Sequence, residues 1–150
     1  MTESLRVIAR YNDGRVLKGT TQDFFPNRPG FHLQPLGGGE TVEVRCRQLK
    51  GVFFVKTFEG DKRRTDLHGF ISAPSETTHG RKIAVRFKDG ELICGYSLSY
   101  LPDRDGFVMF PADAGGNNLR IYVLTAATAE VKSGAAADAL AQRILAERQK

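Results

Sequence analysis

Two arginines lie in turns of nearly the same sequence. Arg28 is in Pro-Asn-Arg-Pro-Gly-Phe, and Arg104 is in Pro-Asp-Arg-Asp-Gly-Phe. Two guanidinium groups held at equivalent places could fork onto a phosphate or a carboxylate. A structural explanation stays open beside this one, because each arginine could instead pair with an acid of its own unit, Asp23 or Asp103. Arg28 and Arg104 are therefore the first candidates for a ligand-binding site.

Arg6 and Arg10 form an Arg-x-x-x-Arg pattern near the N-terminus. This pattern is the first half of the signature by which PilZ domains hold cyclic di-GMP, but the second half is absent downstream. Alternation in a predicted strand also places both arginines on the same face as Ile8, away from the predicted core, where charged residues are expected. The pair is a tentative nucleotide-binding candidate.

The one dense basic cluster runs through residues 62–64, Lys-Arg-Arg, with His68 nearby. Arg63 and Arg64 could bind an anionic partner, or they could keep a solvated loop exposed. The net charge of +5 is otherwise spread over the chain: residues 1–80 have 12 basic and 9 acidic side chains, and residues 81–150 have 10 and 8. Such a balance permits an anionic partner without requiring one.

Enzyme chemistry finds no support in the motifs. The histidines, His32, His68 and His79, lack the spacing of metal ligands, and no nucleophile elbow or phosphate loop is present. The sequence predicts a non-enzyme without cofactor or metal. Cys46 and Cys94 are expected to be reduced thiols in a cytoplasmic protein, with one disulfide left open, and no apolar run is long enough to span a membrane.

The elements that must position these residues come in two copies. Shifting the sequence by 76 positions aligns residues 6–35 with 82–111, with nine identities that include Arg28 with Arg104 and Gly19 with Gly95. With one extra residue in the second copy, residues 42–44 then align with 119–121. An internal duplication follows from this self-similarity.

Each copy has the pattern of short strands. Apolar residues alternate with mostly polar ones over 5–11 and 83–87, and an Asp-Gly step typical of a tight hairpin follows both. Gly19 and Gly95 fall inside the next predicted strands, 15–25 and 91–101, where a glycine indicates a bulge or a sharp bend. Further strands are expected to begin at 31 and 107, and to cover 40–46, 118–124 and 51–58.

Two other features stand out. The adjacent pairs Phe24-Phe25 and Phe53-Phe54, with Phe58, could stack on bases, although alternation places at least one ring of each pair in the core. The remaining ring, if exposed, would contact the second copy or a partner protein. Residues 135–150 have apolar residues at helical spacing, with charges that suit the helix dipole, and predict a C-terminal helix.

The pattern Val-x-Val-x-Phe-x-Asp-Gly-x-x-Ile-x-Gly, from 83 to 95 and more loosely from 7 to 19, resembles the first motif of Sm-like small β-barrels. The fuller pattern is similar to a bacterial family of unknown function that occurs alone or beside PilZ-type signalling domains. Its carriers are residues 13–19, 23–29, 52–61 and 117–123. The resemblance implies an SH3-like or Sm-like barrel, but the Asp, Asn and Arg-Gly residues by which Sm proteins bind RNA are missing here.

These observations predict a mostly β protein with two tandem Sm-like or SH3-like barrels and a C-terminal helix. The predicted parts are a first barrel at 1–58, a polar connector loop at 59–80, a second barrel at 81–133 and a helix at 134–150. The expected function is a non-catalytic binding or adaptor module in bacterial cytoplasmic regulation. Its partner would be another protein, with a nucleic acid or a cyclic dinucleotide as the alternative and a homodimer also open.

Overall fold

A computed structural model describes residues 4–26, 28–59, 76–77, 80–112 and 117–148 of the chain, with the backbone alone at 76–77. The strands are β1 Leu5–Tyr11, β2 Val16–Thr21, β3 Gly30–Pro35, β4 Val42–Arg45, β5 Leu49–Val55, β6 Glu76–Thr77, β7 Gly80–Phe87, β8 Leu92–Ser97, β9 Gly106–Pro111, β10 Asn118–Leu124 and β11 Thr128–Ser133. Helix α1 is Ala135–Arg148, and two 3-10 turns cover Cys46–Gln48 and Thr125–Ala127. The predicted mostly β class with a C-terminal helix is confirmed.

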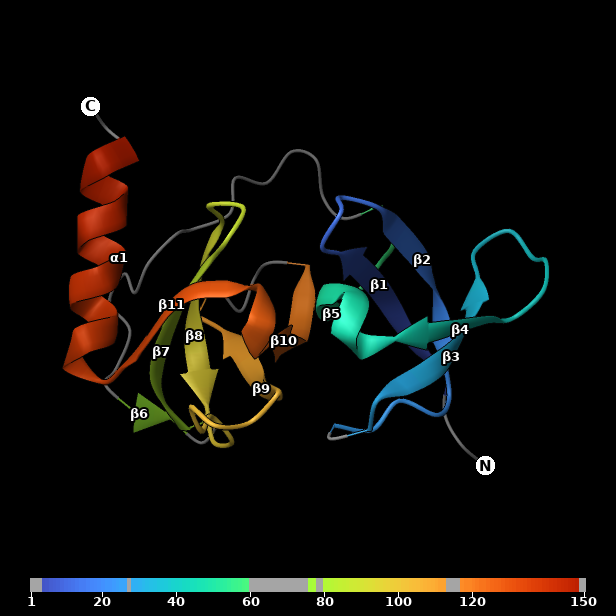
Figure 1. Cartoon of the computed structure of the whole chain (residues 1–150), viewed down its shortest axis with the longest axis horizontal. Helices are drawn as coiled ribbons and strands as arrows, with labels where there is room; N and C mark the ends of the chain where they lie inside the picture. The colour runs from blue at the N-terminus through green and yellow to red at the C-terminus, as the bar shows by residue number, and fades with distance from the viewer. Residues whose placement is uncertain (1–3, 27, 60–75, 78–79, 113–116, 149–150) are drawn as a thin grey trace.

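Within the described residues, one eleven-stranded sheet has the order β11-β7-β8-β9-β10-β5-β1-β2-β3-β4, with β6 paired to β7 beside this path. The strand order is the same in each half: the fifth strand comes first, then the first to the fourth (Figure 1). Among the described residues, every strand pairing is antiparallel. The repeat seen in the sequence is therefore a repeat of strand topology.

The first hairpin of each half turns at the predicted Asp-Gly step. Gly14 and Gly90 have φ values of +94° and +95°, a region that L side chains rarely adopt. Their amides donate to the carbonyls of Tyr11 and Phe87, at 3.1 and 2.9 Å. Glycine at these positions fixes the register of β1 on β2 and of β7 on β8.

The glycine inside the second strand of each half lies where that strand begins to pair with the third strand. β2 pairs with β1 along its length but meets β3 only at Gly19 and Thr20, and β8 meets β9 only at Gly95 and Tyr96. A Cβ at Gly19 would lie 2.1 Å from the Gln34 carbonyl oxygen, and one at Gly95 would lie 2.1 Å from the Phe110 carbonyl oxygen. The predicted bend is thus a close backbone approach that only glycine allows.

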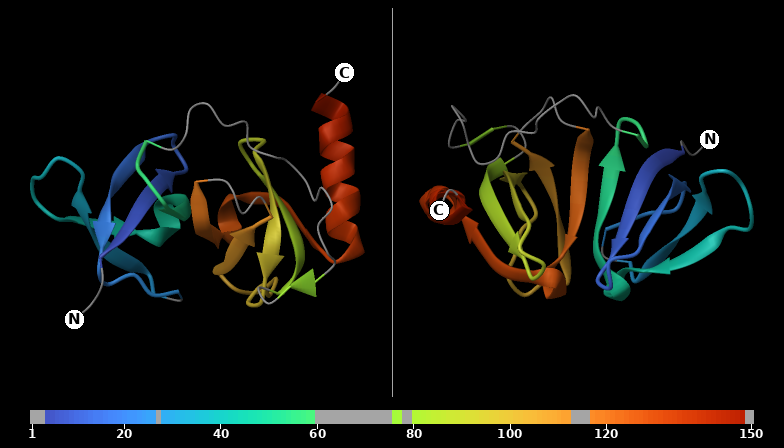
Figure 2. Two further views of the ribbon diagram at one scale, coloured as in Figure 1. Left: turned by 180° about the vertical axis from the view of Figure 1, so that it is seen from behind. Right: turned by 90° about the horizontal axis from the view of Figure 1, so that it is seen from above.

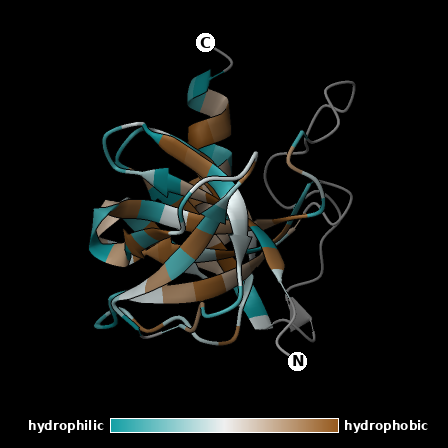
Figure 3. Ribbon diagram, turned by 90° about the vertical axis from the view of Figure 1, so that its right-hand side faces the viewer, coloured by the Kyte–Doolittle hydropathy of each residue, from teal (hydrophilic) through white to brown (hydrophobic). Residues whose placement is uncertain are grey.

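The two halves are joined by antiparallel pairing of β5 with β10 (Figure 2). Side chains alternate across this seam. Phe54 and Tyr122 face a core built mainly by the first half, while Phe53 and Ile121 face a core built mainly by the second half. In Figure 3 hydrophobic stretches run along the inner strands, and many turns are hydrophilic. Each core therefore uses side chains from both halves.

A lysine adds an electrostatic link across the same seam. Lys50 lies where the β1–β5 register shifts, and its side chain is 12% exposed. Its ammonium donates to Asp89 at 2.7 Å and to Glu91, both in the hairpin between β7 and β8, and it lies over the Phe87 ring. Burial raises the pKa of Asp89, but the hydrogen bonds from Lys50 and from the Glu91 amide, together with the charge of Lys50, outweigh it and the pKa is lowered.

The structure changes several predicted boundaries. The described pairings form an open sheet and close neither half, so two separate barrels are not confirmed. The predicted connector is mostly outside the described residues, but Glu76–Thr77 and Gly80 belong to strands rather than to a loop. The strand predicted at 51–58 is Leu49–Val55, and a matching fifth strand, Thr128–Ser133, was not predicted because its polar residues give no alternation.

The predicted alignment of residues 42–44 with 119–121 is wrong. Gly30 pairs with Arg45 and Gly106 pairs with Leu124, so the third strands are offset by 106 − 30 = 76 and the fourth by 124 − 45 = 79. Three added residues, not one, lengthen the start of β10. These additions include Asn118 and Arg120, which pair with β5. The added length extends the seam between the halves.

Helix α1 covers one face of β7 and β8. The predicted apolar stripe is buried against this face, together with Ala84, Leu92 and Cys94; its members are Ala137, Leu140, Ala141 and Ile144, with Leu145 partly buried. Lys82 bonds to Asp138 at 3.0 Å. Cys46 and Cys94 are both buried and unbonded to each other, as expected of reduced thiols.

Acid is expected to loosen α1 from the sheet. Hydrogen bonds from Arg143 and then Arg86 lower the pKa of Glu130 from 4.5 to about 2. A depressed pKa stabilises the folded state above the unfolded value, so this contribution is lost as the pH falls from about 4.5 towards 2. The protection factors of the α1 amides, which are exchange rates corrected for the intrinsic effect of pH, should therefore fall over this window. E130Q should flatten that pH dependence, whereas E40Q, in the β3–β4 loop, should leave it unchanged.

Candidate functional site

The loops that carry Arg28 and Arg104 are anchored by equivalent aromatic contacts. Phe24 packs edge-on against Phe31 with ring centroids 5.3 Å apart, and Tyr100 packs against Phe107 at 4.8 Å. The two loops connect β2 to β3 and β8 to β9. A partly buried aromatic ring at the start of each loop sets where the following residues emerge.

The next apolar residue of each loop faces solvent. Phe25 is 50% exposed and Leu101 is 47% exposed. Their carbonyls accept hydrogen bonds from the backbone amides of Arg28 and Arg104, at 3.3 and 3.1 Å. The Arg28 guanidinium also lies 4.6 Å from the centre of the Phe25 ring. Each half thus presents the same pair, an exposed apolar side chain and an arginine three residues later.

The structural explanation, in which each arginine pairs with an acid of its own half, is not seen among the described residues. Asp23 accepts instead from the amide and Nδ1 of His32, at 2.8 and 2.7 Å, and from Thr21. Burial raises the pKa of Asp23, but these hydrogen bonds together have the larger effect, so the pKa is lowered. The Asp23 carboxylate in turn raises the pKa of His32. Among the described residues, no ion pair is formed by the guanidinium of Arg28 or of Arg104.

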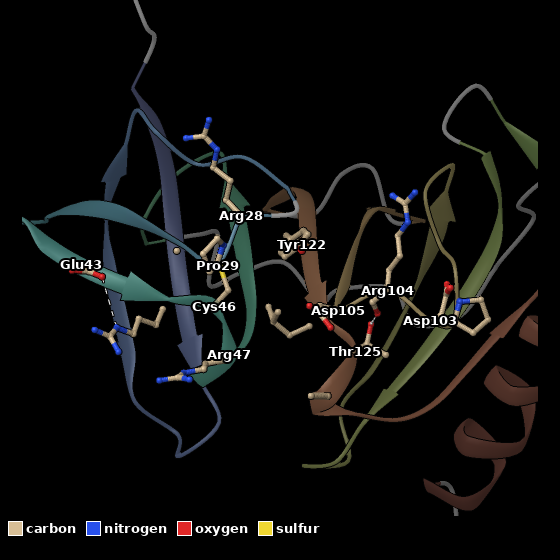
Figure 4. Close-up of a pocket in the computed structure, with 15 residues that line it drawn as sticks. Arg28, Pro29, Glu43, Cys46, Arg47, Asp103, Arg104, Asp105, Tyr122 and Thr125 are labelled. Carbon is tan, nitrogen blue, oxygen red and sulfur yellow. Dashed lines mark hydrogen bonds and ion pairs between the residues drawn. The ribbon is translucent and has the colours of Figure 1, made fainter.

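Both arginines line one groove between the halves, with a volume of about 1270 Å³. Figure 4 shows Arg28 on one side, Arg104 on the other and Tyr122 between them. With the structural offsets of 76 and 79, most lining residues come in equivalent pairs: Arg28 with Arg104, Pro29 with Asp105, Glu43 with Tyr122, Arg45 with Leu124, Cys46 with Thr125 and Arg47 with Ala126. The groove is built from the same surface of each repeat.

The two walls differ in chemistry although their positions are equivalent. The first half contributes Glu43, Arg45 and Arg47, whereas the second half contributes the buried Tyr122 and Leu124. The remaining charged lining residues are Arg28, Arg104, Asp103 and Asp105, so the groove has four arginines and three acids, a net charge of 4 − 3 = +1. A groove with mixed and nearly balanced charges suits a polypeptide better than a polyanion.

The other predicted site residues do not join this groove. Arg6 donates to the Lys56 carbonyl at 3.1 Å, and Arg10 lies over the Phe53 ring. Their neighbour on that face, Ile8, is buried in the second core rather than exposed. Arg63 and Arg64 lie outside the described residues. The predicted arginines therefore separate into a groove pair and a pair on β1, with the last two unplaced.

Most lining residues escaped the sequence analysis, among them Arg45, Arg47, Tyr122 and Leu124. The predicted offset between the fourth strands was incorrect, so it did not show which residues of the two copies are equivalent. The signal that could have identified them is that the residues at 122 and 124 are apolar, whereas the equivalent residues of the first copy are charged.

One thiol, that of Cys46, lies in the lining of the groove. Burial raises the pKa of the Cys46 thiol, which keeps it in its less nucleophilic neutral form. In the described part of the chain, no group of three histidine, cysteine or acidic side chains could hold a metal ion. Within that same part, no helix is long and apolar enough to cross a membrane.

Comparison with known protein families identifies the family to which the chain belongs. Residues 3–135 match the sequence model of a family of unknown function, DUF6982. The chain belongs to DUF6982. The match ends at the first residue of α1, so the DUF6982 region comprises the whole sheet and both walls of the groove. Comparisons with curated proteins and with solved structures found no match for this DUF6982 chain.

Proposed function

We propose that this DUF6982 chain is a non-catalytic binding module that takes up a segment of a partner protein in the groove between its halves. The observation that carries the proposal is the juxtaposition of two equivalent arginine turns across one groove between the halves. Carboxylates of the partner would bind Arg28 and Arg104, and its apolar side chains would pack beside them on the exposed Phe25 and Leu101. The groove is also broad enough for a polypeptide, since ligand pockets for small molecules are commonly about 300–1000 Å³.

The proposal extends to the origin of the scaffold. Each half has five strands in the order fifth, first, second, third, fourth, with a 3-10 turn before the fifth, which supports a pair of opened small barrels of the Sm-like or SH3-like type. A role in bacterial cytoplasmic regulation stays a prediction from the sequence.

The proposal is tested by charge reversal at the two turns. R28E/R104E should weaken capture of the partner protein from a lysate of the source cells by about tenfold or more, because two charged contacts become repulsive. The measurement is quantitative affinity purification with mass spectrometry, followed by titration of the recovered protein. K88E/K132E is the matched control, since it makes the same change in net charge at two exposed residues away from the groove.

The same purification separates the alternatives. Equal capture by R28E/R104E and by the wild type would remove the groove from consideration. Recovery of RNA, DNA or a cyclic dinucleotide in place of protein, with a strong dependence on salt, would support the nucleic-acid or nucleotide alternative.

A further inference from the structure

The sheet ends differently on its two sides. At one end, α1 follows β11 directly and packs against it, and Arg143 bonds to Glu130 of that strand at 2.6 Å. At the other end, β4 pairs with β3, and no strand among the described residues pairs with its outer edge. An unpaired edge presents backbone donors and acceptors to an incoming strand.

The hydrogen-bond pattern shows which groups are presented. The amide of Cys46 donates to the Pro29 carbonyl, and antiparallel strands alternate between bonded and non-bonded pairs. Counting back, Val44 and Val42 bond to β3, whereas the N–H and C=O groups of Glu43 and Arg45 point away from it. The amide of His32, opposite Glu43, agrees with this count, because it donates to the Asp23 carboxylate.

The charge pattern of this edge is self-complementary. Suppose a second β4 lies antiparallel with Val44 opposite Val44 of the other copy. Glu43 of each copy then faces Arg45 of the other, on the same side of the sheet. These two residues have the outward backbone groups, and each bonded pair exchanges two hydrogen bonds, so two pairs exchange four. One register therefore satisfies both the backbone and the charges.

Other strands of a second copy fit this edge less well. β5 already pairs on both sides, with β1 and β10. β11 is the other end strand of the sheet. It would bring Lys132 and Glu130 to the β4 edge, but the Glu130 carboxylate already bonds to Arg86 and Arg143. The positions equivalent to Glu43 and Arg45 in β10 are Tyr122 and Leu124, which pack against the first half. Charges at 43 and 45 thus indicate a contact of a different kind from the seam within the chain.

We infer that β4 pairs with β4 of a second copy of this chain, which forms a two-fold homodimer with a sheet continuous through both copies. The inference needs neither Arg28 nor Arg104, although Glu43 and Arg45 also line the first wall of the groove. Because the strand has four residues, the contact is small and its affinity is expected in the micromolar range.

Sedimentation velocity over about 5–500 µM protein tests the dimer. The wild type should shift from monomer to dimer across this range. E43R and R45E each place like charges across the two-fold axis, and each should raise the dissociation constant by about tenfold or more. The double variant E43R/R45E exchanges the charges and should restore dimerisation, because opposite charges face each other again.

A backbone variant tests the register independently of charge. E43P removes an N–H group that is not bonded to β3, so the fold should persist by circular dichroism while the dimer is lost. K88E is the control for a charge reversal elsewhere. The inference is overturned by a wild type that stays monomeric at the highest concentration, by single variants that dimerise as the wild type does, or by a double variant that fails to recover. Partner capture by the R28E/R104E series is scored separately, so either proposal can fail alone.

Discussion

Replacing Gly95 with alanine is expected to lower the free energy of unfolding by about 2–4 kcal/mol. The added Cβ would lie 2.1 Å from the Phe110 carbonyl oxygen and 3.1 Å from the Met109 Cε atom. A backbone oxygen cannot rotate away as a side chain can, so β8 and β9 must separate where the sheet bends. Urea unfolding followed by circular dichroism measures the loss, and G19A should behave alike because its Cβ meets the Gln34 oxygen at the same distance.

The matched control is Gly90→Asn. Gly90, unlike Gly95, has a positive φ, but no atom lies within 4 Å of its Cβ position and asparagine tolerates a positive φ. G90N should therefore cost much less than G95A. Equal losses for the two variants would show that the close approach of β8 to β9 at Gly95 carries no particular cost.

Phe53→Ala is expected to cost about 3–5 kcal/mol and to weaken the half of the molecule to which Phe53 does not belong. Phe53 is 3% exposed and packs among the second-half residues Ile83, Phe107 and Ile121. Its loss leaves a cavity in that core and removes part of the seam between β5 and β10. Amide hydrogen exchange should therefore show reduced protection in β7 to β9 as well as in β1 to β5.

Phe25→Ala makes the same chemical change at a ring that is 50% exposed, and it should alter stability by less than about 1 kcal/mol. If F53A left the protection of β7 to β9 unchanged, the two halves would unfold independently and the shared cores would have little energetic weight.

Local features were predictable from the sequence. The Asp-Gly hairpins, the bends at Gly19 and Gly95 and the stripe of α1 each depend on residues that are near in sequence, and the structure has all of them. The repeat likewise predicted that Arg28 and Arg104 would occupy equivalent turns, as their matching backbone hydrogen bonds confirm.

Contacts between the halves were harder to predict because they join residues far apart in sequence. The run from Val52 to Val55 is apolar on both faces, which is typical of a strand buried on both sides, but it does not identify the second neighbour. Two added residues at the start of β10 beyond the predicted one were enough to misalign Arg45 and Leu124. For that reason the equivalence of the residues that form the two walls of the groove could not be predicted before the strand register was known.

The pairing of β5 with β10 has a consequence for synthesis on the ribosome. Phe53 pairs with Ile121, which is 121 − 53 = 68 residues later in the chain. At about 5–20 residues per second, roughly 3–14 s pass before this partner is translated. Throughout that interval the nascent chain holds a strand with two apolar faces and one open edge, the combination that favours association with neighbouring chains. Translation speed between codons 53 and 121 is therefore expected to influence how much of this protein reaches its native state.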